Sequence, residues 1–418
     1  MGTETRTTGV IGAAEAEAAG RGGGSGAADR AAAVVRDAVA ALAERFAADR
    51  RARQQRDRLD PADLEALAAA GLLRTGLPAD RGGLWHDLAG STRGICEIYR
   101  VLARGDSSLA LTTSMHPAVL AFWLATPEVD GRHAEAWRRQ RDTVFATVEG
   151  GAWWGTITSE PGSGGDVSRT RTAARRDGRE GQSPEEGWRL TGQKHFGSGT
   201  GVTSYMLTTA VADGEDEPDW FYVPLAGSRL DGSDGIALVA PWDGHGMVAT
   251  QSHALAFDGA EAVRFAWPGH LGDLIDSAAP FFGTLFTAVV LGIVEEAIDT
   301  ARSQLAPRAA EMRAFEQVEW TQAELEAWTM AQVYEGALRA IESGRPAAGA
   351  TVRAKVAGAQ LAESCLGRVC KVLGGGTFSR RSPFGHWFED VRALGFLRPP
   401  WGLAFDGLLL DSWAPTAG

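Results

Sequence analysis

The chain has 418 residues, enough to bury a large core and to divide into two or three domains. Its net charge of -12 argues against non-specific binding to nucleic acid and against attachment to an anionic membrane surface. The apolar and charged fractions, 44% and 22%, are ordinary for a soluble globular protein.

Three cysteines, Cys96, Cys365 and Cys370, lie among apolar residues without the spacing of a disulfide framework or a metal site. We therefore expect reduced core thiols, a cytoplasmic location and no bound metal. No run looks long and apolar enough to span a bilayer, and the N-terminus lacks the charged start and apolar stretch of a signal peptide. A composition rich in Gly, Ala and Glu predicts a disordered tail over residues 1–27.

Residues 28–142 carry a helical pattern and form a predicted N-terminal helical domain. The apolar residues of its first helix share one stripe: Val34, Val35, Val39, Leu42 and Phe46. A second helix is predicted to begin at Pro61, with Asp60 as its N-cap, and to end at Gly71. Helices resume over residues 88–124.

Residues 143–272 change to short apolar or alternating runs between Gly, Asp and Pro, which predict strands. The runs begin with TVFATVEGG at residues 143–151 and end with HALAFDGAEAV at residues 253–263. We expect an antiparallel β-barrel or sandwich here, followed over residues 273–418 by an up-down four-helix bundle. The order of helices, strands and helices makes this an α+β chain, without the alternation of a parallel sheet.

Two polar turns in the middle domain are the strongest candidates for a ligand site. The first, TSEPGSGGD at residues 158–166, leaves backbone N–H groups and hydroxyls free for the polar edge of a flat ligand. The second, GQKHFGSG at residues 192–199, places the ring of Phe196 beside the hydroxyl of Ser198. Two such turns around an aromatic ring suit a ring cofactor, although glycine-rich turns also serve simply to join strands.

The two turns resemble the flavin-contacting segment of the acyl-CoA dehydrogenase superfamily, which carries T-E-P-x-x-G-S-D, a loop, and then N-G-x-K-x-W-I-T. Ser159, Phe196 and Ser198 are near-equivalent exchanges for the family's threonine, tryptophan and second threonine. Gly165 replaces the family's serine and removes one hydroxyl. The stretch AAAGLLRTGLPADRGG at residues 68–83 also resembles the family's first-domain signature, A-G-L followed by P-x-x-x-G-G.

This resemblance covers about residues 28–413 and implies a helical–β–helical fold that binds FAD, with FMN as the alternative. It assigns the middle-domain flavin contacts to six residues: Thr158, Ser159, Gly164, Gly165, Phe196 and Ser198.

A further glycine-rich turn, in the C-terminal part, is KVLGGGTF at residues 371–378. It matches the family's Q-x-x-G-G-x-G-[FY] in part, with lysine for glutamine. In the family this turn binds the adenine and pyrophosphate of FAD across a subunit interface. The resemblance therefore implies that Lys371, Gly374 and Gly375 contact FAD and that the protein is a homodimer or homotetramer. Glycines at this place also serve as an ordinary helix C-cap.

The family also uses an arginine followed by a phenylalanine after the first bundle helix. Arg313 and Phe315 in EMRAFEQVEW are the candidates for these cofactor contacts, and Arg308 is an alternative arginine.

Dehydrogenases of this family remove a proton α to a thioester with a carboxylate, which lies in R-D-x6-[YF]-E-G-T late in the last domain. Arg398 falls at that glutamate, and a guanidinium is no base at neutral pH. The family's other base position, residues 279–284, also lacks a carboxylate. His116, His386 and Asp406 are candidates for a relocated base; for His116, a satisfied structural histidine is the alternative interpretation.

Arg398 itself carries two hypotheses. It is either the exposed arginine of a rigid Arg-Pro-Pro-Trp turn, or a group that faces the flavin and pairs with a carboxylate or phosphate of the substrate.

Three functions are considered, and the first is the lead prediction. The first is an FAD-dependent oxidoreductase that oxidises an acyl thioester or related carbonyl substrate, free or carrier-bound, by hydride transfer to flavin N5. The second is a reduced-flavin monooxygenase of the same superfamily, a branch that needs no α-proton base. Its F-x-S-G motif resembles Phe196 to Gly199. However, the branch carries a histidine near the position of the lost glutamate, and this chain has none there. The third is a non-catalytic flavin-binding or interaction protein.

Overall fold

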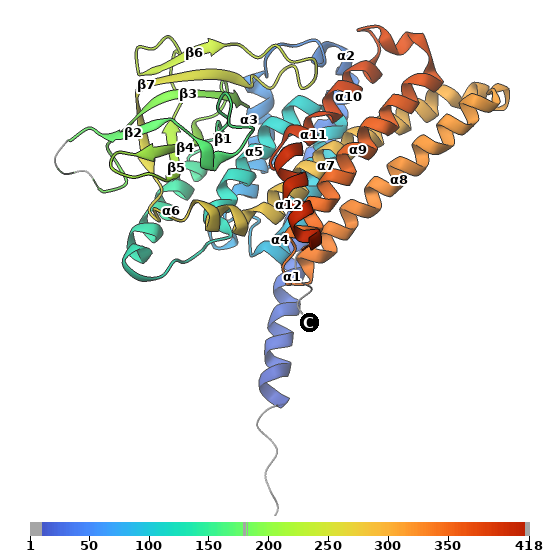
Figure 1. Ribbon diagram of the computed structural model, residues 1–418. Helices are drawn as coiled ribbons and strands as arrows, with labels where there is room; N and C mark the ends of the chain where they lie inside the picture. Colours follow the sequence, from blue (N-terminus) through green and yellow to red (C-terminus); the bar gives the residue numbers. More distant parts are fainter. Residues whose placement is uncertain (1–10, 179–180, 182, 414–418) are drawn as a thin grey trace, which may run out of the picture.

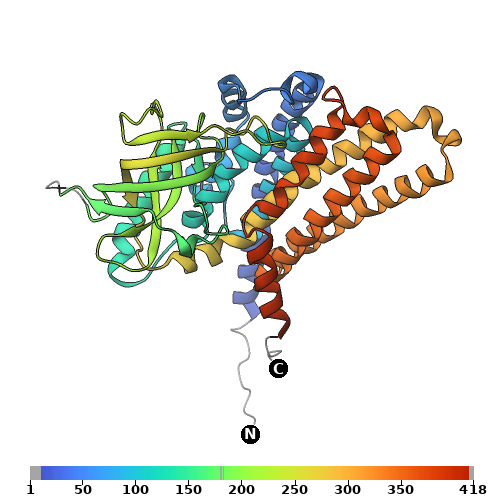
Figure 2. The same ribbon diagram turned by 45° about the horizontal axis from the view of Figure 1, so that its top comes forward.

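The computed structural model describes residues 11–178, 181 and 183–413, and Figure 1 shows helices at the N-terminus, a β-sheet in the middle and a helical bundle at the C-terminus. This is the predicted α+β architecture. In both views the sheet lies on one side of the molecule and the long bundle helices on the other, with the N-terminal helices between them (Figure 2).

The N-terminal part consists of α1 Ile11–Ala48, α2 Arg50–Arg53, α3 Pro61–Ala69, α4 Leu88–Gly105, α5 Ser107–Leu124 and α6 Ala134–Glu149. Asp60 caps α3 as expected, and its side chain accepts a hydrogen bond from the N–H of Ala62 at 3.0 Å.

Two boundaries differ from the sequence expectations. Of the expected tail, residues 1–10 lie outside the described residues, whereas residues 11–27 belong to α1. The alanines and glutamates of residues 13–19 favour a helix, although the glycines of residues 20–26 do not. Residues 143–149, which we expected to be a strand, are the last two turns of α6. Gln140, Val144 and Val148 are buried four residues apart, so the apolar period there is that of a helix.

The sheet contains β1 Trp154–Thr156, β2 Ala173–Arg176, β3 Trp188–Gly197, β4 Tyr205–Ala212, β5 Pro218–Pro224, β6 Ile236–Ala240 and β7 His253–Arg264. The strands follow the order β1-β4-β2-β3-β7-β5, and β5 also pairs with β4, so the path closes into a barrel. Most pairs are antiparallel, but β4 pairs in parallel with both β1 and β2. Ile157, Leu190, Phe221 and Leu255 lie in the barrel core.

The C-terminal part consists of α7 Leu271–Leu305, α8 Ala314–Glu342, α9 Ala348–Leu373, α10 Pro383–Val391, α11 Ala393–Phe396 and α12 Trp401–Trp413. Helix α7 is long and apolar enough by composition to cross a membrane, contrary to the expectation from sequence. However, 89% of its most apolar window is buried inside the protein, as in the core helix of a globular domain.

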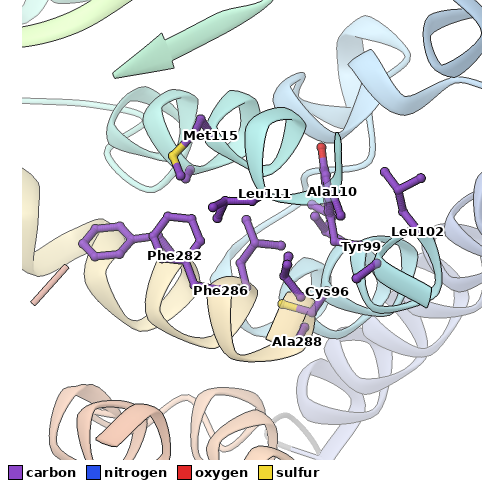
Figure 3. Packing of buried hydrophobic residues seen from close by; sticks show 14 of the residues in the cluster. Cys96, Tyr99, Leu102, Ala110, Leu111, Met115, Phe282, Phe286 and Ala288 are labelled. Atoms are coloured by element: carbon purple, nitrogen blue, oxygen red, sulfur yellow. The ribbon is translucent and has the colours of Figure 1, made fainter. Parts of the chain in front are cut away.

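The main core forms where α4, α5 and α7 meet. Figure 3 shows Tyr99 of α4, Leu111 and Met115 of α5, and Phe282 and Phe286 of α7 pointing into the same interior. Each side chain of this size contributes about 1.5–3 kcal/mol when it is fully buried. All of α5 is buried, so this helix fixes the N-terminal part against both the bundle and the sheet.

Candidate functional site

The first polar turn leaves the sheet after β1 and is shaped by glycines. Gly162, Gly164 and Gly165 have φ angles of 81°, 66° and 84°, which side chains disfavour. The Ser163 hydroxyl donates to the carbonyl of Glu160 at 3.0 Å and accepts from the N–H of Gly165 at 3.2 Å. The space beside Gly164 is open, with no atom within 4 Å of the place a Cβ would take. The turn is thus held from inside while one side stays accessible.

The second turn ends β3 and presents an aromatic ring to solvent. Phe196 is 60% exposed and has a φ of 60°, an unusual conformation for a bulky residue. Its ring stands edge-to-face with Trp242 at 6.2 Å between centroids. The hydroxyl of the buried Ser198 bonds that of Ser252 at 2.8 Å. Because backbone strain collects at ligand sites, Phe196 is the clearest mark of a binding surface here.

The two turns lie side by side. The N–H of His195 donates to the carbonyl of Ser159 at 2.8 Å, and Thr156 forms a β-bridge with Ser198. The structure therefore brings together the six middle-domain residues that the sequence singled out.

A buried ion pair joins the turns from behind, which sequence reasoning missed. Glu160 of the first turn and Lys194 of the second are 2.7 Å apart and almost fully buried. Burial would raise the pKa of Glu160, but hydrogen bonds from Lys194 and Thr170 outweigh it and hold the pKa at about 2. Burial lowers the pKa of Lys194 to about 8, against the opposing effect of Glu160. The sequence did contain a signal for this pair. Glu160 lies in the first motif and Lys194 in the second, and a charged residue is seldom buried without a partner of opposite charge.

Arg398 enters the site from the segment between α11 and α12. Its Nε and Nη2 donate to the Thr158 hydroxyl at 3.2 and 2.6 Å, and its Nη1 donates to the Gly165 carbonyl. Pro400 packs on Gly165 so closely that a Cβ there would lie 2.8 Å from Pro400 Cγ. The family's serine would therefore not fit at residue 165. Glycine at this position and the Arg-Pro-Pro segment depend on each other, because Pro400 occupies the space that a serine side chain would need. Arg398 lies on the first turn and is not the exposed arginine of a free turn.

His116 is fully buried in α5 and both its ring nitrogens are engaged. Nδ1 accepts from the N–H of Trp154 and Nε2 bonds the carbonyl of Leu73, each at 3.2 Å. Burial lowers its pKa to about 4, so the ring is neutral at pH 7. This geometry favours the structural interpretation over the catalytic one.

The other two base candidates lie elsewhere. Asp406 is exposed on α12, and His386 on α10 bonds the carbonyl of Arg380 at 3.3 Å. His386 lines a small cavity of about 20 Å³ together with Asp390. Burial raises the pKa of Asp390 to about 6, while its carboxylate accepts hydrogen bonds from Ser107 and Met247 at 2.5 Å each. These contacts tie the bundle to the other two parts of the chain.

The residues predicted to hold the far end of FAD gather at the end of the bundle. Arg308 donates to the carbonyl of Val372 at 3.0 Å, which joins the α7–α8 connection to the end of α9. Arg313 and Phe315 are exposed there, and Lys371 lies 3.5 Å from Glu319. In Figures 1 and 2 the α7–α8 connection forms the tip of the bundle that points away from the sheet.

A cavity of about 430 Å³ lies at the same end of the bundle, next to the turn that ends α9. It is lined by Gln304, Leu373, Gly376, Thr377, Ser379, Arg381, Ser382, Pro383 and Phe384. Gly374 has a φ of 82° and ends α9. It therefore acts as a helix C-cap, whether or not it also contacts a cofactor.

The middle-domain site fits a flavin ring. An exposed aromatic ring in a strained conformation, an open glycine edge and hydroxyls on either side are what a planar ring with a polar rim requires. Among the residues that the structure describes, no group of His, Cys, Asp and Glu is arranged to hold a metal ion.

No family model and no curated protein matches the sequence. Solved structures do match, and KijD3 in complex with FMN and dTDP-3-amino-2,3,6-trideoxy-4-keto-3-methyl-D-glucose is 21% identical, with a TM-score of 0.76 over 91% of this chain and 93% of KijD3. Glutaryl-coenzyme A dehydrogenase with glutaryl-CoA is 16% identical, with a TM-score of 0.76 over 91% and 94%. FMN-bound TdsC from Paenibacillus sp. A11-2, a dibenzothiophene monooxygenase, is 20% identical, with a TM-score of 0.72 over 92% and 99%.

Proposed function

We propose, from the acyl-CoA dehydrogenase fold that this chain shares with several flavoproteins, that it is a flavin-dependent oxidoreductase. The observation that carries the proposal is Phe196, an exposed ring between two turns that a buried ion pair locks together. Phe196 would stack on the flavin ring, and the Ser159 hydroxyl, the backbone at Thr158 and the open edge at Gly164 would hold its polar rim. A bound flavin supplies the two electrons, or accepts the hydride, that the reaction transfers.

Of the two reactions, we favour oxygenation by a reduced flavin over the dehydrogenation that was the lead prediction from the sequence. The place of the family's carboxylate base is taken by Arg398, and both carboxylates of the first turn are engaged. Glu160 is paired with Lys194, and Asp166 accepts bonds from the backbone and hydroxyl of Ser168 at 2.9 and 2.7 Å. Oxygenation needs no α-proton base: one atom of O2 enters the substrate and the other leaves as water.

Dehydrogenation of an acyl thioester or related carbonyl substrate, free or carrier-bound, is the second candidate. It is favoured by the glutaryl-coenzyme A dehydrogenase structure, whose TM-score of 0.76 equals that of KijD3. A relocated base would have to come from outside the first turn, and His386 and Asp406 remain the candidates.

For the cofactor we propose FAD, because Leu373 and Gly376, which flank Gly374 and Gly375 in the chain, line a cavity of about 430 Å³ that could receive its adenine half. FMN is the second candidate, since two of the three cations considered for the FAD phosphates, Lys371 and the alternative arginine Arg308, already have acidic partners, whereas Arg313 is exposed. Lys371 lies near Glu319, and Arg308 pairs with Glu316 at 3.0 Å.

We also propose a homodimer or homotetramer in the cytoplasm. The α7–α8 connection points away from the sheet (Figures 1 and 2), so a second copy of the chain would supply the far end of the cofactor site. Exposed apolar residues on α8 and α12 support this assembly: Phe315, Val318, Leu325, Trp328, Phe405, Leu409, Leu410 and Trp413.

Anaerobic reduction of the purified flavoprotein tests the proposal. Bleaching of the flavin by an acyl thioester would establish dehydrogenation. Product formation that requires both a separate reductase and oxygen would establish the monooxygenase. A colourless protein that takes up neither FAD nor FMN would refute both enzymatic proposals and leave a non-catalytic role.

A further inference from the structure

Arg398, which is partly exposed, differs in its partners from the two arginines that are buried in the described chain. Arg53 is bonded to the carboxylates of Asp63 and Asp106, and Arg264 to those of Glu215 and Asp219. Arg398 is bonded only to a neutral hydroxyl and a backbone carbonyl, and no described carboxylate lies within ion-pair distance of it.

The guanidinium remains a cation despite this. Burial lowers the pKa of Arg398 to about 10, and only the charge of Asp166 opposes the shift. It is therefore charged at pH 7. Desolvation of a charge that lacks an ionic partner lowers the stability of the folded protein. Such a charge is expected where it has a function, such as binding a ligand of opposite charge.

Hydrogen-bond donors are left over at the same place. A guanidinium carries five N–H groups, and the three contacts to Thr158 and Gly165 leave one on each terminal nitrogen without a described acceptor. The Thr158 hydroxyl accepts from Arg398, so its own proton is free to be donated.

The support behind Arg398 is rigid. The buried ammonium of Lys355 on α9 donates to the carbonyl of Pro399 at 2.8 Å, and Pro400 fits against Gly165. Lys355 adds a second positive charge behind the Arg398–Pro400 segment without contacting the first turn. A cation fixed from both sides loses little conformational freedom on binding a ligand.

We propose that Arg398 and Thr158 form an oxyanion-binding site beside the flavin ring, which takes a carboxylate or phosphate carried by the substrate close to the reacting atom. This rests on the proposed function and names its substrate class. Where dehydrogenases of this fold have an anionic base, this chain binds an anionic substrate.

The test uses the full chain without added flavin, so that anion binding is measured apart from catalysis. Acetate and inorganic phosphate are titrated separately at constant ionic strength against chloride, and binding is followed by the rise in the thermal midpoint. The wild type, Arg398→Met, Arg398→Lys and Thr158→Val are compared. Arg392→Met is the matched control, because this nearby arginine is exposed and already pairs with Glu389.

Acetate or phosphate should bind the wild type and Arg392→Met equally, and Arg398→Met at least about tenfold more weakly, since a charge-assisted bond is lost. Arg398→Lys should lie between them, and Thr158→Val should weaken binding even if Arg398→Met does not fold. The better of the two probes identifies the oxyanion.

Equal affinities in the wild type, Arg398→Met and Thr158→Val would overturn the inference, as would a wild type that binds neither anion. Flavin titration of the same samples separates the two proposals. Arg398-dependent anion binding in a protein that takes up no flavin would leave the oxyanion site standing while the oxidoreductase proposal fails.

Discussion

The carboxylate of Glu160 and the ammonium of Lys194 lie 2.7 Å apart beneath the candidate flavin site, although they come from different turns of the middle domain. Thr170 and Thr172 bond the same carboxylate, and Arg171 donates its N–H to the second oxygen at 2.8 Å. Both carboxylate oxygens of Glu160 therefore accept hydrogen bonds. The pair fixes the distance between the turns that carry Thr158 and Phe196.

Lys194→Met should lower the free energy of unfolding by about 3–5 kcal/mol, because it leaves a buried carboxylate without its cation. Urea unfolding measures this. Arg139→Met removes the exposed pair with Glu135 and should cost at most about 1 kcal/mol. If both variants lose equally little, the pair does not fix the turns. Glu160→Gln combined with Lys194→Met should recover part of the loss.

Phe196→Ala should weaken flavin binding about tenfold, since a stacking ring contributes on the order of 1 kcal/mol beyond its buried area. Stability should hardly change, because the ring is 60% exposed. Fluorescence titration with FAD and with FMN measures the affinity. Phe396→Ala removes a similarly exposed ring on α11, outside both the proposed flavin contacts and the proposed subunit interface, and serves as the control. Equal affinity in the wild type and Phe196→Ala would exclude stacking on this ring.

Gly165→Ser restores the family's hydroxyl but should destabilise the protein by about 2–4 kcal/mol. The residue combines a φ of 84° with a contact that would place Cβ 2.8 Å from Pro400 Cγ. Gly164→Ser has a similar φ of 66° but open space around it, so it should show only the backbone cost of about 1–2 kcal/mol. Chemical unfolding of both compares them. Indistinguishable losses would mean that Pro400 moves aside.

His116 should make the protein less stable as the pH falls from about 6.5 to 4. Its pKa is lowered in the folded state, so in this window the unfolded chain takes up a proton that the folded protein refuses. The loss amounts to about 3 kcal/mol at most. Urea unfolding at pH 7 and 4.5 should therefore show a smaller pH dependence for His116→Gln than for the wild type.

His245→Gln is the control for this measurement, because His245 is exposed and should keep the pH dependence of the wild type. The prediction fails if all three proteins lose the same stability between the two pH values.

Trp328→Glu should shift the protein to a smaller assembly, because it places a charge on the exposed apolar side of α8. Light scattering after size exclusion measures the mass. Arg139→Glu, on α6, changes an exposed residue outside the bundle and should leave the mass unchanged. A wild type that is monomeric at all concentrations would contradict the proposed assembly.

The sequence determined the order of helices, strands and helices, because apolar periodicity and breaker residues act locally. It also determined that Gly162, Gly164 and Gly165 form a turn and that Phe196 adjoins a second one, since these residues are close in sequence. The same local evidence misled at residues 143–149, where a short apolar run suits a strand or a helix alike and only burial in the main core decides.

Only the tertiary structure decided what the isolated polar residues do. His116 became a structural residue through partners 43 and 38 positions away, at Leu73 and Trp154. Arg398 reached Thr158 across 240 positions, and Pro400 came to lie where Gly165 leaves room. A charged side chain gives the same local pattern whether it is solvated or buried. Its role depends on which acceptors the folded chain places around it, and no sequence window contains them.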